Sequence, residues 1–460
     1  MIGAPTFTQL AARLPGARLQ GADLALHTIS TDTRTLVAGD VFVALRGERF
    51  DGHDHLASAI GQGAAAVIVD HEIAGLAVPQ LIVRDTLAAL GQIAALNREA
   101  FSGPVIALTG SSGKTTLRSM ISQILALTGP VLATQGNLNN HIGVPLTLLR
   151  LQAEHRLAVI EMGASARGEI AGLCEIARPT LALINNIMPA HIEGFGSLEG
   201  IADAKAEIYQ GLVAEGVAVI NLDESWACYW HELVKPRRSY TFALEKPQAD
   251  AFARQIRLCA DYSDFELVIQ QQVVPVRLRM AGQHHVRNAV AAALVAFLQG
   301  ATLAQIREGL ESFEPVSGRM LRQPGVHGAT LIDDSYNANP GSLAAAIAAL
   351  AAAGAGQAWL VLGDMRELGP QARALHAAAG EQARRAGLAR VWTLGELADA
   401  ASSAFGDGGR HFASHAELAA ALADELPAAA RCLVKGSRGS AMDKIVTALL
   451  SRGEETHHVV

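Results

Sequence analysis

The chain has 460 residues, too many for one hydrophobic core, so we expect two to four domains. Half of the residues are apolar and 18% are charged, and 44 acidic against 37 basic residues give a net charge of −7. This mild acidity, without any block of like charges, argues against a nucleic-acid partner.

The sequence also argues against membrane insertion and a cysteine framework. No run of about 18 apolar residues could span a bilayer, and the first residues lack the basic start and apolar core of a signal peptide. The four cysteines are scattered and form no CxxC pair, which excludes a disulfide or zinc–thiolate pattern. We therefore expect a reduced, cytoplasmic protein.

Residues 1–84 are predicted to form a small α/β domain. Three short apolar runs, at 41–45, 67–69 and 81–83, are typical of buried strands. Polar segments separate these runs and leave room for helices between them.

The segment 109–116, Thr-Gly-Ser-Ser-Gly-Lys-Thr-Thr, lies between an apolar run at 105–108 and a helix-period segment. Glycines let backbone N–H groups curl around phosphate oxygens, and the start of the helix adds positive potential. Lys114 would reach the β- and γ-phosphates of a nucleotide, and Thr115 would offer its hydroxyl to magnesium. Leu108 occupies the place of the first glycine in the longer form of this motif. A plain glycine-rich turn is the alternative reading. The predicted nucleotide-binding residues are Gly110, Ser111, Ser112, Gly113, Lys114, Thr115 and Thr116.

Residues 85–314 are predicted to form a central domain with a parallel sheet. The runs 157–160 and 181–184 are continuously aliphatic, as in strands buried on both faces, and they end at Glu161 and Asn185. Ligands collect beyond the carboxyl ends of such strands. Late in this domain, alternating segments at 265–269 and 274–278 predict antiparallel strands.

Residues 315–460 return to strand–helix alternation and predict a Rossmann-like third domain. Its strands include the runs 359–362 and 432–434, and the alanine-rich stretch 343–353 is expected to be a buried helix. The predicted fold is therefore α/β in three domains, with a central P-loop domain flanked by a small N-terminal domain and a Rossmann-like C-terminal domain.

Motifs along nearly the whole chain resemble those of the Mur ligase family, which builds the peptide of bacterial cell-wall precursors. The short phosphate loop is that family's variant, and the segment 134–145, Thr-Gln-Gly-Asn-Leu-Asn-Asn-His-Ile-Gly-Val-Pro, resembles the family member that adds D-alanyl-D-alanine. The resemblance implies an ATP-dependent ligase for peptidoglycan biosynthesis, which phosphorylates the terminal carboxylate of UDP-N-acetylmuramoyl-tripeptide. The amine of D-alanyl-D-alanine would then displace phosphate. The other matching segments are 30–34, 51–53, 161–163, 186–197, 282–284, 318–319, 332–340, 362–369 and 434–437.

The resemblance also implies a magnesium site and a modified lysine. Thr115, Glu161 and His191 would be metal ligands, since a carboxylate after a strand suits Mg²⁺. A solvated strand-end carboxylate and a structural histidine are the alternatives. Lys205 resembles a lysine that the family carries as a carbamate, which requires burial of a neutral amine; an exposed helix lysine is its alternative. The residues expected to act in catalysis are Lys114, Lys205, His191 and Arg319.

Further matches imply contacts with ATP and with the two substrates. Asn288 would contact adenine, although His285 replaces an asparagine that the family often has before it. Arg319 would contact phosphate, and Asp334 would contact the ribose. The substrates would be bound by two groups of residues, some of which could instead be turn-forming or surface residues. These are Asn137, Asn139, Asn140, Tyr336, Asn337 and Asn339 near the reaction centre, and Thr31, Asp32, Arg34 and His53 at the uridine-diphosphate end.

Three other functions fit part of the sequence. A sister ligase would add diaminopimelate or lysine to the dipeptide precursor, but the Asp-Asn-Pro-Arg signature of the diaminopimelate type is absent. Folylpolyglutamate synthase would not explain the N-terminal domain, and a plain P-loop ATPase would not explain the third. Whether the tripeptide ends in diaminopimelate or lysine stays open. A monomer is expected.

Overall fold

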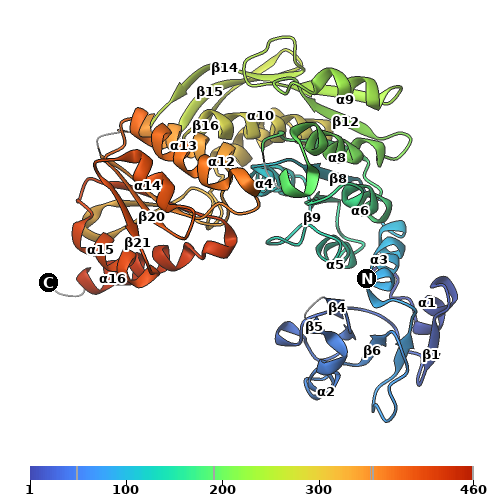
Figure 1. The fold of residues 1–460 in the computed structure, drawn as a ribbon. Coiled ribbons are helices and arrows are strands. Elements are labelled where there is room, and N and C mark those ends of the chain that lie inside the picture. The colour runs from blue at the N-terminus through green and yellow to red at the C-terminus, as the bar shows by residue number, and fades with distance from the viewer. Residues whose placement is uncertain (48–49, 190–191, 353, 355–356, 458–460) are drawn as a thin grey trace.

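The computed structural model describes residues 1–47, 50–189, 192–352, 354 and 357–457. Figure 1 shows three α/β domains in chain order, with the N-terminal domain at one end of the molecule and the third domain beside the central one. Each domain has a main sheet of its own, so the predicted three-domain α/β architecture is confirmed. No helix in the described part of the chain is both long and apolar enough to cross a membrane.

The N-terminal domain holds a five-stranded sheet in the order β1-β7-β6-β3-β2 and a separate hairpin, β4-β5. The runs predicted at 41–45, 67–69 and 81–83 fall on β3, β6 and β7. Adjacent strands of the main sheet are parallel except for β1 and β7. The elements are α1 (Phe7–Arg13), β1 (Arg18–Gln20), β2 (Ile29–Ser30), β3 (Val41–Val43), β4 (Arg46–Gly47), β5 (Phe50–Asp51), α2 (Leu56–Gly61), β6 (Ala66–Val69), β7 (Gln80–Ile82) and α3 (Thr86–Glu99).

The central domain is built on a nine-stranded sheet in the order β16-β15-β14-β13-β12-β11-β8-β10-β9. The runs at 105–108, 157–160 and 181–184 form the parallel strands β8, β10 and β11, and β12 pairs parallel with β11. The elements are β8 (Val105–Thr109), α4 (Lys114–Ala126), β9 (Val131–Ala133), α5 (Gly143–Leu149), β10 (Leu157–Glu161), α6 (Glu169–Ala177), β11 (Leu181–Ile184), α7 (Ile192–Phe195), α8 (Leu198–Gln210), β12 (Val217–Asn221), α9 (Ala227–Val234), β13 (Arg238–Phe242), β14 (Ala251–Leu258), β15 (Ser263–Ile269), β16 (Gln272–Leu278), α10 (Gln283–Leu298) and α11 (Leu303–Glu311).

Burial on both faces explains why these strands are continuously aliphatic. Along β8, Ile106 and Leu108 join the core that contains α4 and α10, whereas Val105 and Ala107 join the core that contains α8. The core that contains α8 continues into the N-terminal domain through α3, where it includes Leu90. The N-terminal and central domains therefore share one apolar core.

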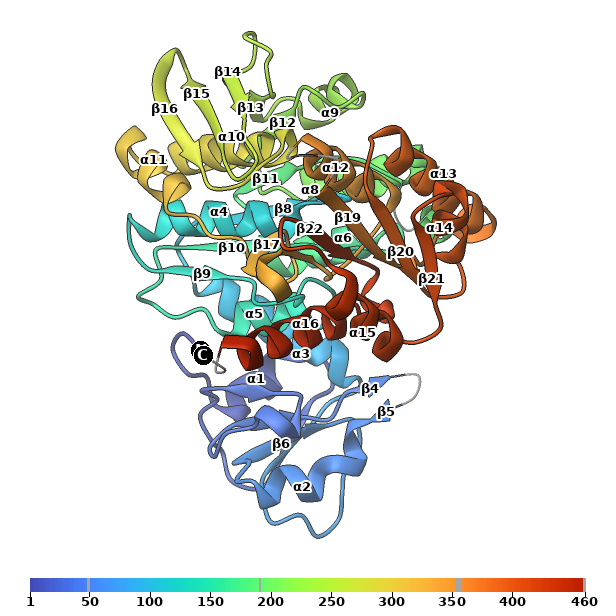
Figure 2. The ribbon, with the colours of Figure 1, turned by 90° about the vertical axis from the view of Figure 1, so that its left-hand side faces the viewer.

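The antiparallel strands predicted late in the central domain are confirmed. β15 pairs antiparallel with both β14 and β16, with Ser263 opposite Leu278 at one end of the second ladder. These strands extend the parallel sheet beyond β13 and do not form a layer of their own. Figure 2 shows them at the edge of the central domain far from the N-terminal sheet.

The third domain is a six-stranded sheet in the order β17-β18-β22-β19-β20-β21, parallel except for the β17–β18 pair. The alanine-rich helix predicted at 343–353 is α12, and its buried side is formed by Leu343, Ala346, Ile347 and Leu350. The elements are β17 (Leu321–Pro324), β18 (Thr330–Asp334), α12 (Pro340–Ala352), β19 (Ala358–Gly363), α13 (Ala372–Arg385), β20 (Arg390–Leu394), α14 (Asp399–Phe405), β21 (Gly409–Phe412), α15 (His415–Glu425), β22 (Arg431–Lys435) and α16 (Asp443–His457).

Candidate active site

The glycine loop lies where three parallel strands end side by side. β8 lies between β10 and β11 in the sheet, so its end at Thr109 is flanked by Glu161 and by Asn185. Gly113 has φ +73°, and a Cβ there would lie 2.9 Å from Asn185 Nδ2 and 3.1 Å from Asn288 Nδ2. The loop therefore needs glycine at this position, both for its conformation and for close approach of the two amides.

Two asparagines after β11 fix the shape of the loop. The Asn186 carbonyl accepts from Ser111 N at 2.9 Å, and its side chain both accepts from Ser112 N at 2.9 Å and donates to Ser112 O at 3.0 Å. Asn185 Nδ2 donates to Ser112 O and to Asn288 Oδ1, both at 3.0 Å. These bonds leave the N-terminus of α4 free to bind an anion with its unpaired backbone N–H groups.

A buried carboxylate faces the start of α4. Glu161 is 2% exposed and accepts hydrogen bonds from Thr115 Oγ1 at 3.0 Å and Asn139 Nδ2 at 2.8 Å. Arg118 Nε lies 4.0 Å from the same carboxylate. A hydroxyl and a carboxylate beside a phosphate loop are hard oxygen donors, and this set fits Mg²⁺.

Two lysines approach the site from different helices. Lys114, the first residue of α4, donates to Gly110 O at 2.8 Å, and burial lowers the pKa of its ammonium group. The nearby charge of Glu161 opposes this shift, and that of Arg319 adds to it. Lys205, on α8, is 3% exposed, and burial together with the Lys114 charge lowers its pKa to about 7. A substantial share of Lys205 is therefore neutral near pH 7.

The third domain contributes a stacked arginine and a buried ion pair. The Arg319 guanidinium lies 4.1 Å from the centre of the Tyr336 ring, which fixes its plane. Lys435, at the end of β22, contacts Asp334 Oδ2 at 2.6 Å and donates to Asn337 O at 3.0 Å. Burial raises the pKa of Asp334, and the Lys435 ammonium opposes that rise.

One cavity of about 450 Å³ brings most of the predicted site residues together. Its walls come from the central and third domains, so it lies between them. Its volume falls within the usual range for small-molecule sites. The predicted residues that line it are Gly110, Ser111, Ser112, Gly113, Lys114, Thr115, Thr116, Asn137, Asn139, Asn140, Glu161, Lys205, Asn288, Arg319, Asp334, Tyr336, Asn337 and Asn339.

The predicted N-terminal residues Thr31, Asp32, Arg34 and His53 do not line this cavity. Asp32 and Arg34 form an ion pair with each other at 2.6 Å, and the Arg34 side chain is 86% exposed. This ion pair holds the pKa of Asp32 down at about 2. His191, the third expected metal ligand, lies outside the described residues.

Two asparagines of the cavity also shape the backbone, as the turn-forming alternative predicted. Asn140 Oδ1 accepts from Gly143 N at 2.9 Å at the start of α5. Asn339 Oδ1 accepts from Ser342 N at 2.8 Å at the start of α12. The remaining amide nitrogen of each side chain is not used by these bonds and can donate to a ligand.

Several residues of the cavity wall were not predicted from the sequence to have a role. Asn186, Lys435 and His284 all line it. Asn186 and Lys435 follow or end the aliphatic runs 181–184 and 432–434, so their position at strand ends was a usable signal. His285, next to His284, also lines the cavity, and its two ring nitrogens are buried without a hydrogen-bond partner among the described residues. Burial lowers the pKa of His284 to about 4, so its imidazole is neutral at pH 7.

Comparison with known proteins covers all three domains. Three family models match the chain: "Mur ligase family, catalytic domain" over residues 25–98, "Mur ligase middle domain" over 108–296, and "Mur ligase, glutamate ligase domain" over 318–438. The chain is 44% identical to UDP-N-acetylmuramoyl-tripeptide–D-alanyl-D-alanine ligase of Escherichia coli (strain K12), covering 97% of this chain and 99% of that protein. It is 40% identical to the enzyme of the same name from Haemophilus influenzae, covering 96% and 97%.

Solved structures share the same arrangement. A crystal structure of MurF from Acinetobacter baumannii matches with a TM-score of 0.88 and 36% identity, covering 97% of this chain and 98% of that one. The structure of MurF ligase from Thermotoga maritima in complex with ADP matches with a TM-score of 0.81 and 27% identity, covering 94% and 98%.

Proposed function

The chain belongs to the Mur ligase family, and we propose that it is an ATP-dependent ligase that joins D-alanyl-D-alanine to UDP-N-acetylmuramoyl-tripeptide in peptidoglycan synthesis. The observation that carries this proposal is the cavity between the central and third domains. It combines a phosphate loop with polar residues of the third domain, whereas a phosphate loop alone would serve any ATPase. The similar ligases, which match over nearly their full lengths, support the choice of substrates.

In the proposed reaction, a terminal carboxylate oxygen of the tripeptide attacks the γ-phosphorus of ATP, and ADP leaves. The resulting acyl phosphate has a good leaving group, which a free carboxylate lacks. The amine of D-alanyl-D-alanine then attacks the acyl carbon and loses a proton, and inorganic phosphate leaves. One ATP is converted to ADP and phosphate for each amide bond formed.

Lys114 and Arg319 are proposed to bind the phosphates from opposite sides. Lys114 belongs to the loop in the central domain, and Arg319 belongs to the third domain. Positive groups aimed at the transferred phosphoryl group stabilise the charge that develops on it. The stacking of Arg319 on Tyr336 holds its planar fork in place.

Thr115 and Glu161 are proposed to hold Mg²⁺, with His191 as a further ligand. When bound, Mg²⁺ would neutralise part of the negative charge of the phosphates. Lys205 is proposed to carry a carbamate, formed when its neutral amine adds carbon dioxide and loses a proton. The new anion would replace a buried ammonium near Lys114.

The remaining predicted residues are proposed to orient the reactants. Asn288 and Asp334 would bind the adenine and the ribose. Asn137, Asn139 and Asn140 would bind the muramoyl-peptide, whereas Tyr336, Asn337 and Asn339 would face the incoming amine. The N-terminal group Thr31, Asp32, Arg34 and His53 would bind the uridine-diphosphate end. We further propose that the enzyme is a cytoplasmic monomer without a nucleic-acid partner.

The test is phosphate release with purified protein, ATP, a muramoyl-tripeptide and D-alanyl-D-alanine, with the product weighed by mass spectrometry. We expect release only with all three substrates and a pentapeptide product. Tripeptides ending in diaminopimelate and in lysine, assayed in parallel, determine which one is used. Release with the dipeptide precursor and a free diamino acid would identify the sister ligase. Turnover without any acceptor would identify a plain ATPase.

A further inference from the structure

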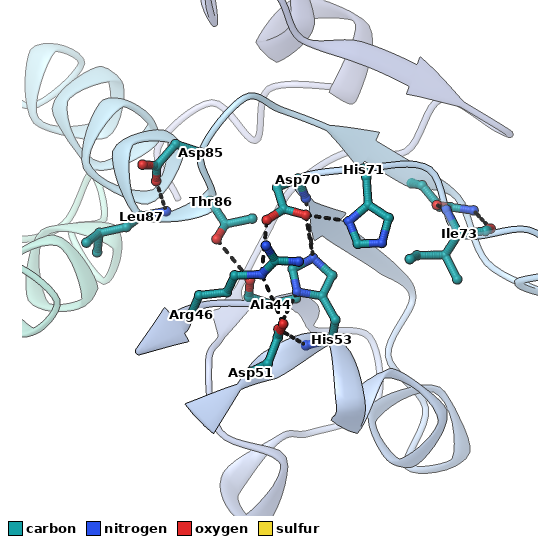
Figure 3. A network of polar contacts seen from close by, with 11 residues as sticks. Ala44, Arg46, Asp51, His53, Asp70, His71, Ile73, Asp85, Thr86 and Leu87 are labelled. Atoms are coloured by element: carbon teal, nitrogen blue, oxygen red, sulfur yellow. Dashed lines mark hydrogen bonds and ion pairs between the residues drawn. The ribbon is translucent and has the colours of Figure 1, made fainter. Parts of the chain in front are cut away.

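A cluster of imidazoles and carboxylates lies in the N-terminal domain, outside the cavity described above. His53 belongs to a short 3-10 helix, Gly52–His55, which follows β5, whereas Asp70 and His71 follow the end of β6. Figure 3 shows the three side chains pointing toward one another. One ligand atom from each lies within 4.8 Å of the other two, and within the described ranges they are the one such group of three.

The donor atoms of this cluster converge on one oxygen. Asp70 Oδ1 lies 3.2 Å from His53 Nε2 and 2.5 Å from His71 Nδ1. Zinc bonds of about 2.0–2.1 Å at tetrahedral angles place ligand atoms roughly 3.3 Å apart. The His53–Asp70 pair already has this separation. The His71 side chain is 54% exposed, so its ring can turn outward and lengthen the distance from Nδ1 to Asp70 Oδ1 to the same value.

A second carboxylate positions the His53 ring. Its Nδ1 lies 2.6 Å from Asp51 Oδ1, and its Nε2 faces Asp70 Oδ1. The backbone N–H of Asp70 lies 3.4 Å from Nε2, which is long for a hydrogen bond. A carboxylate that accepts from the second nitrogen of a histidine is the usual support of a metal-bound imidazole.

Arg46 pairs with the two carboxylates of the cluster from one side. Its Nε lies 3.0 Å from Asp51 Oδ2 and 3.2 Å from Asp70 Oδ2, so it occupies the outer oxygens and leaves Asp70 Oδ1 for a metal. The Arg46 side chain is 53% exposed, so water screens its repulsion of a cation.

We propose that His53 Nε2, Asp70 Oδ1 and His71 Nδ1 form a binding site for a divalent transition-metal ion, with Zn²⁺ as the expected ion. Two imidazoles and one carboxylate select zinc, cobalt or nickel over magnesium and calcium. Water completes the coordination at the exposed side of His71, which is also the entry path. The bound ion joins the 3-10 helix after β5 to the end of β6. The site shares His53 with the residues proposed to bind the uridine-diphosphate end, whereas Asp70 and His71 have no proposed role in the ligase reaction.

The experiment is titration of chelator-treated, full-length protein with ZnCl₂ by calorimetry, repeated with Co²⁺ to record its visible absorption. We expect one ion per chain. His71→Ala should weaken binding at least about tenfold, and Asp51→Asn, which removes the support of His53, by about 10- to 100-fold. Phosphate release by His71→Ala should equal that of the wild type, because His71 is outside the ligase site.

A matched control removes the exposed Cys228 and His231, which lie three residues apart on α9 and are the kind of pair that binds zinc adventitiously. The double variant Cys228→Ser/His231→Ala should keep the affinity and the stoichiometry of the wild type. Equal zinc binding by the wild type and His71→Ala would overturn the proposal. In that case the cluster is a hydrogen-bond network only.

Discussion

Replacing Lys205 by methionine should make the protein more stable and less active. Methionine keeps an unbranched apolar side chain of similar length but cannot be charged. The Lys205 side chain is buried on α8, and among the described residues its ammonium pairs with no carboxylate and lies 5.8 Å from the centre of the Phe195 ring. A buried charge with such poor compensation destabilises the folded state.

The size and pH dependence of the gain follow from the pKa of Lys205. Burial lowers it from 10.5 to about 7, so the unfolded chain keeps a proton that the folded chain has lost over that range. Stability of the wild type therefore rises with pH between 7 and 10.5. At about 1.4 kcal/mol per pH unit, the penalty below pH 7 is roughly 5 kcal/mol, and it falls to about 2 kcal/mol near pH 9. Lys205→Met removes this penalty.

Urea unfolding followed by tryptophan fluorescence measures the effect, because the buried Trp230 on α9 lies 6.1 Å from Tyr209 on α8. Wild type and Lys205→Met are compared at pH 6 and pH 9 in buffer free of carbon dioxide. The control, Lys444→Met, changes an exposed lysine of α16 and should shift stability by less than about 0.5 kcal/mol.

Added bicarbonate should stabilise the wild type at pH 8 and leave Lys205→Met unchanged, because a carbamate forms only on a neutral amine. Phosphate release by Lys205→Met should fall on the order of 100-fold or more. A variant no more stable than the wild type at pH 6 would refute the reasoning. An equal gain in stability at pH 6 and pH 9 would also refute it, because such a gain would come from packing.

Three further substitutions test other parts of the site. Glu161→Gln keeps the size of the side chain but loses the charge, so the magnesium concentration for half-maximal phosphate release should rise at least about tenfold; an unchanged requirement would place the metal elsewhere. Asp334→Asn leaves the Lys435 ammonium buried without a carboxylate. The free energy of unfolding of the third domain, measured with urea, should therefore fall by about 3–5 kcal/mol. A smaller loss would mean that water reaches the ammonium. Arg319→Lys keeps the charge but not the planar contact with Tyr336, so kcat should fall about tenfold or more. Equal turnover would show that charge alone is needed.

The sequence predicted those parts of the fold in which one local pattern has one structural outcome. β8, β10 and β11 are continuously aliphatic because both faces are buried, and they appear where expected. The hairpin β15–β16 alternates between polar and apolar residues, and this alternation predicted its antiparallel strands. β13, which reads Arg-Ser-Tyr-Thr-Phe, was not predicted as a strand, because two of its five residues are apolar and only Phe242 is fully buried.

The site was predicted in part from position and in part from resemblance. Lys205 lies four residues from both Ile201 and Tyr209, so helical spacing alone places it on a buried face of α8. No local pattern could place Arg319 near Lys114, because 205 residues separate them and their distance depends on how two domains pack. His53 and His71 illustrate the same limit. Their cluster depends on the end of β6 meeting the turn after β5.

The charges of the cavity explain why a neutral Lys205 matters for the proposed reaction. Besides Lys205, the cations Lys114, Arg287, Arg319 and Lys435 line the wall with the carboxylates Glu161, Glu169 and Asp334, and Arg287 is paired with Asp223. Because Lys435 is paired with Asp334, Lys114 and Arg319 remain for the phosphates. A further cation at Lys205 would add to the positive charge near Lys114. The proposed carbamate would turn that cation into an anion, which would favour a bound metal ion beside the nucleotide.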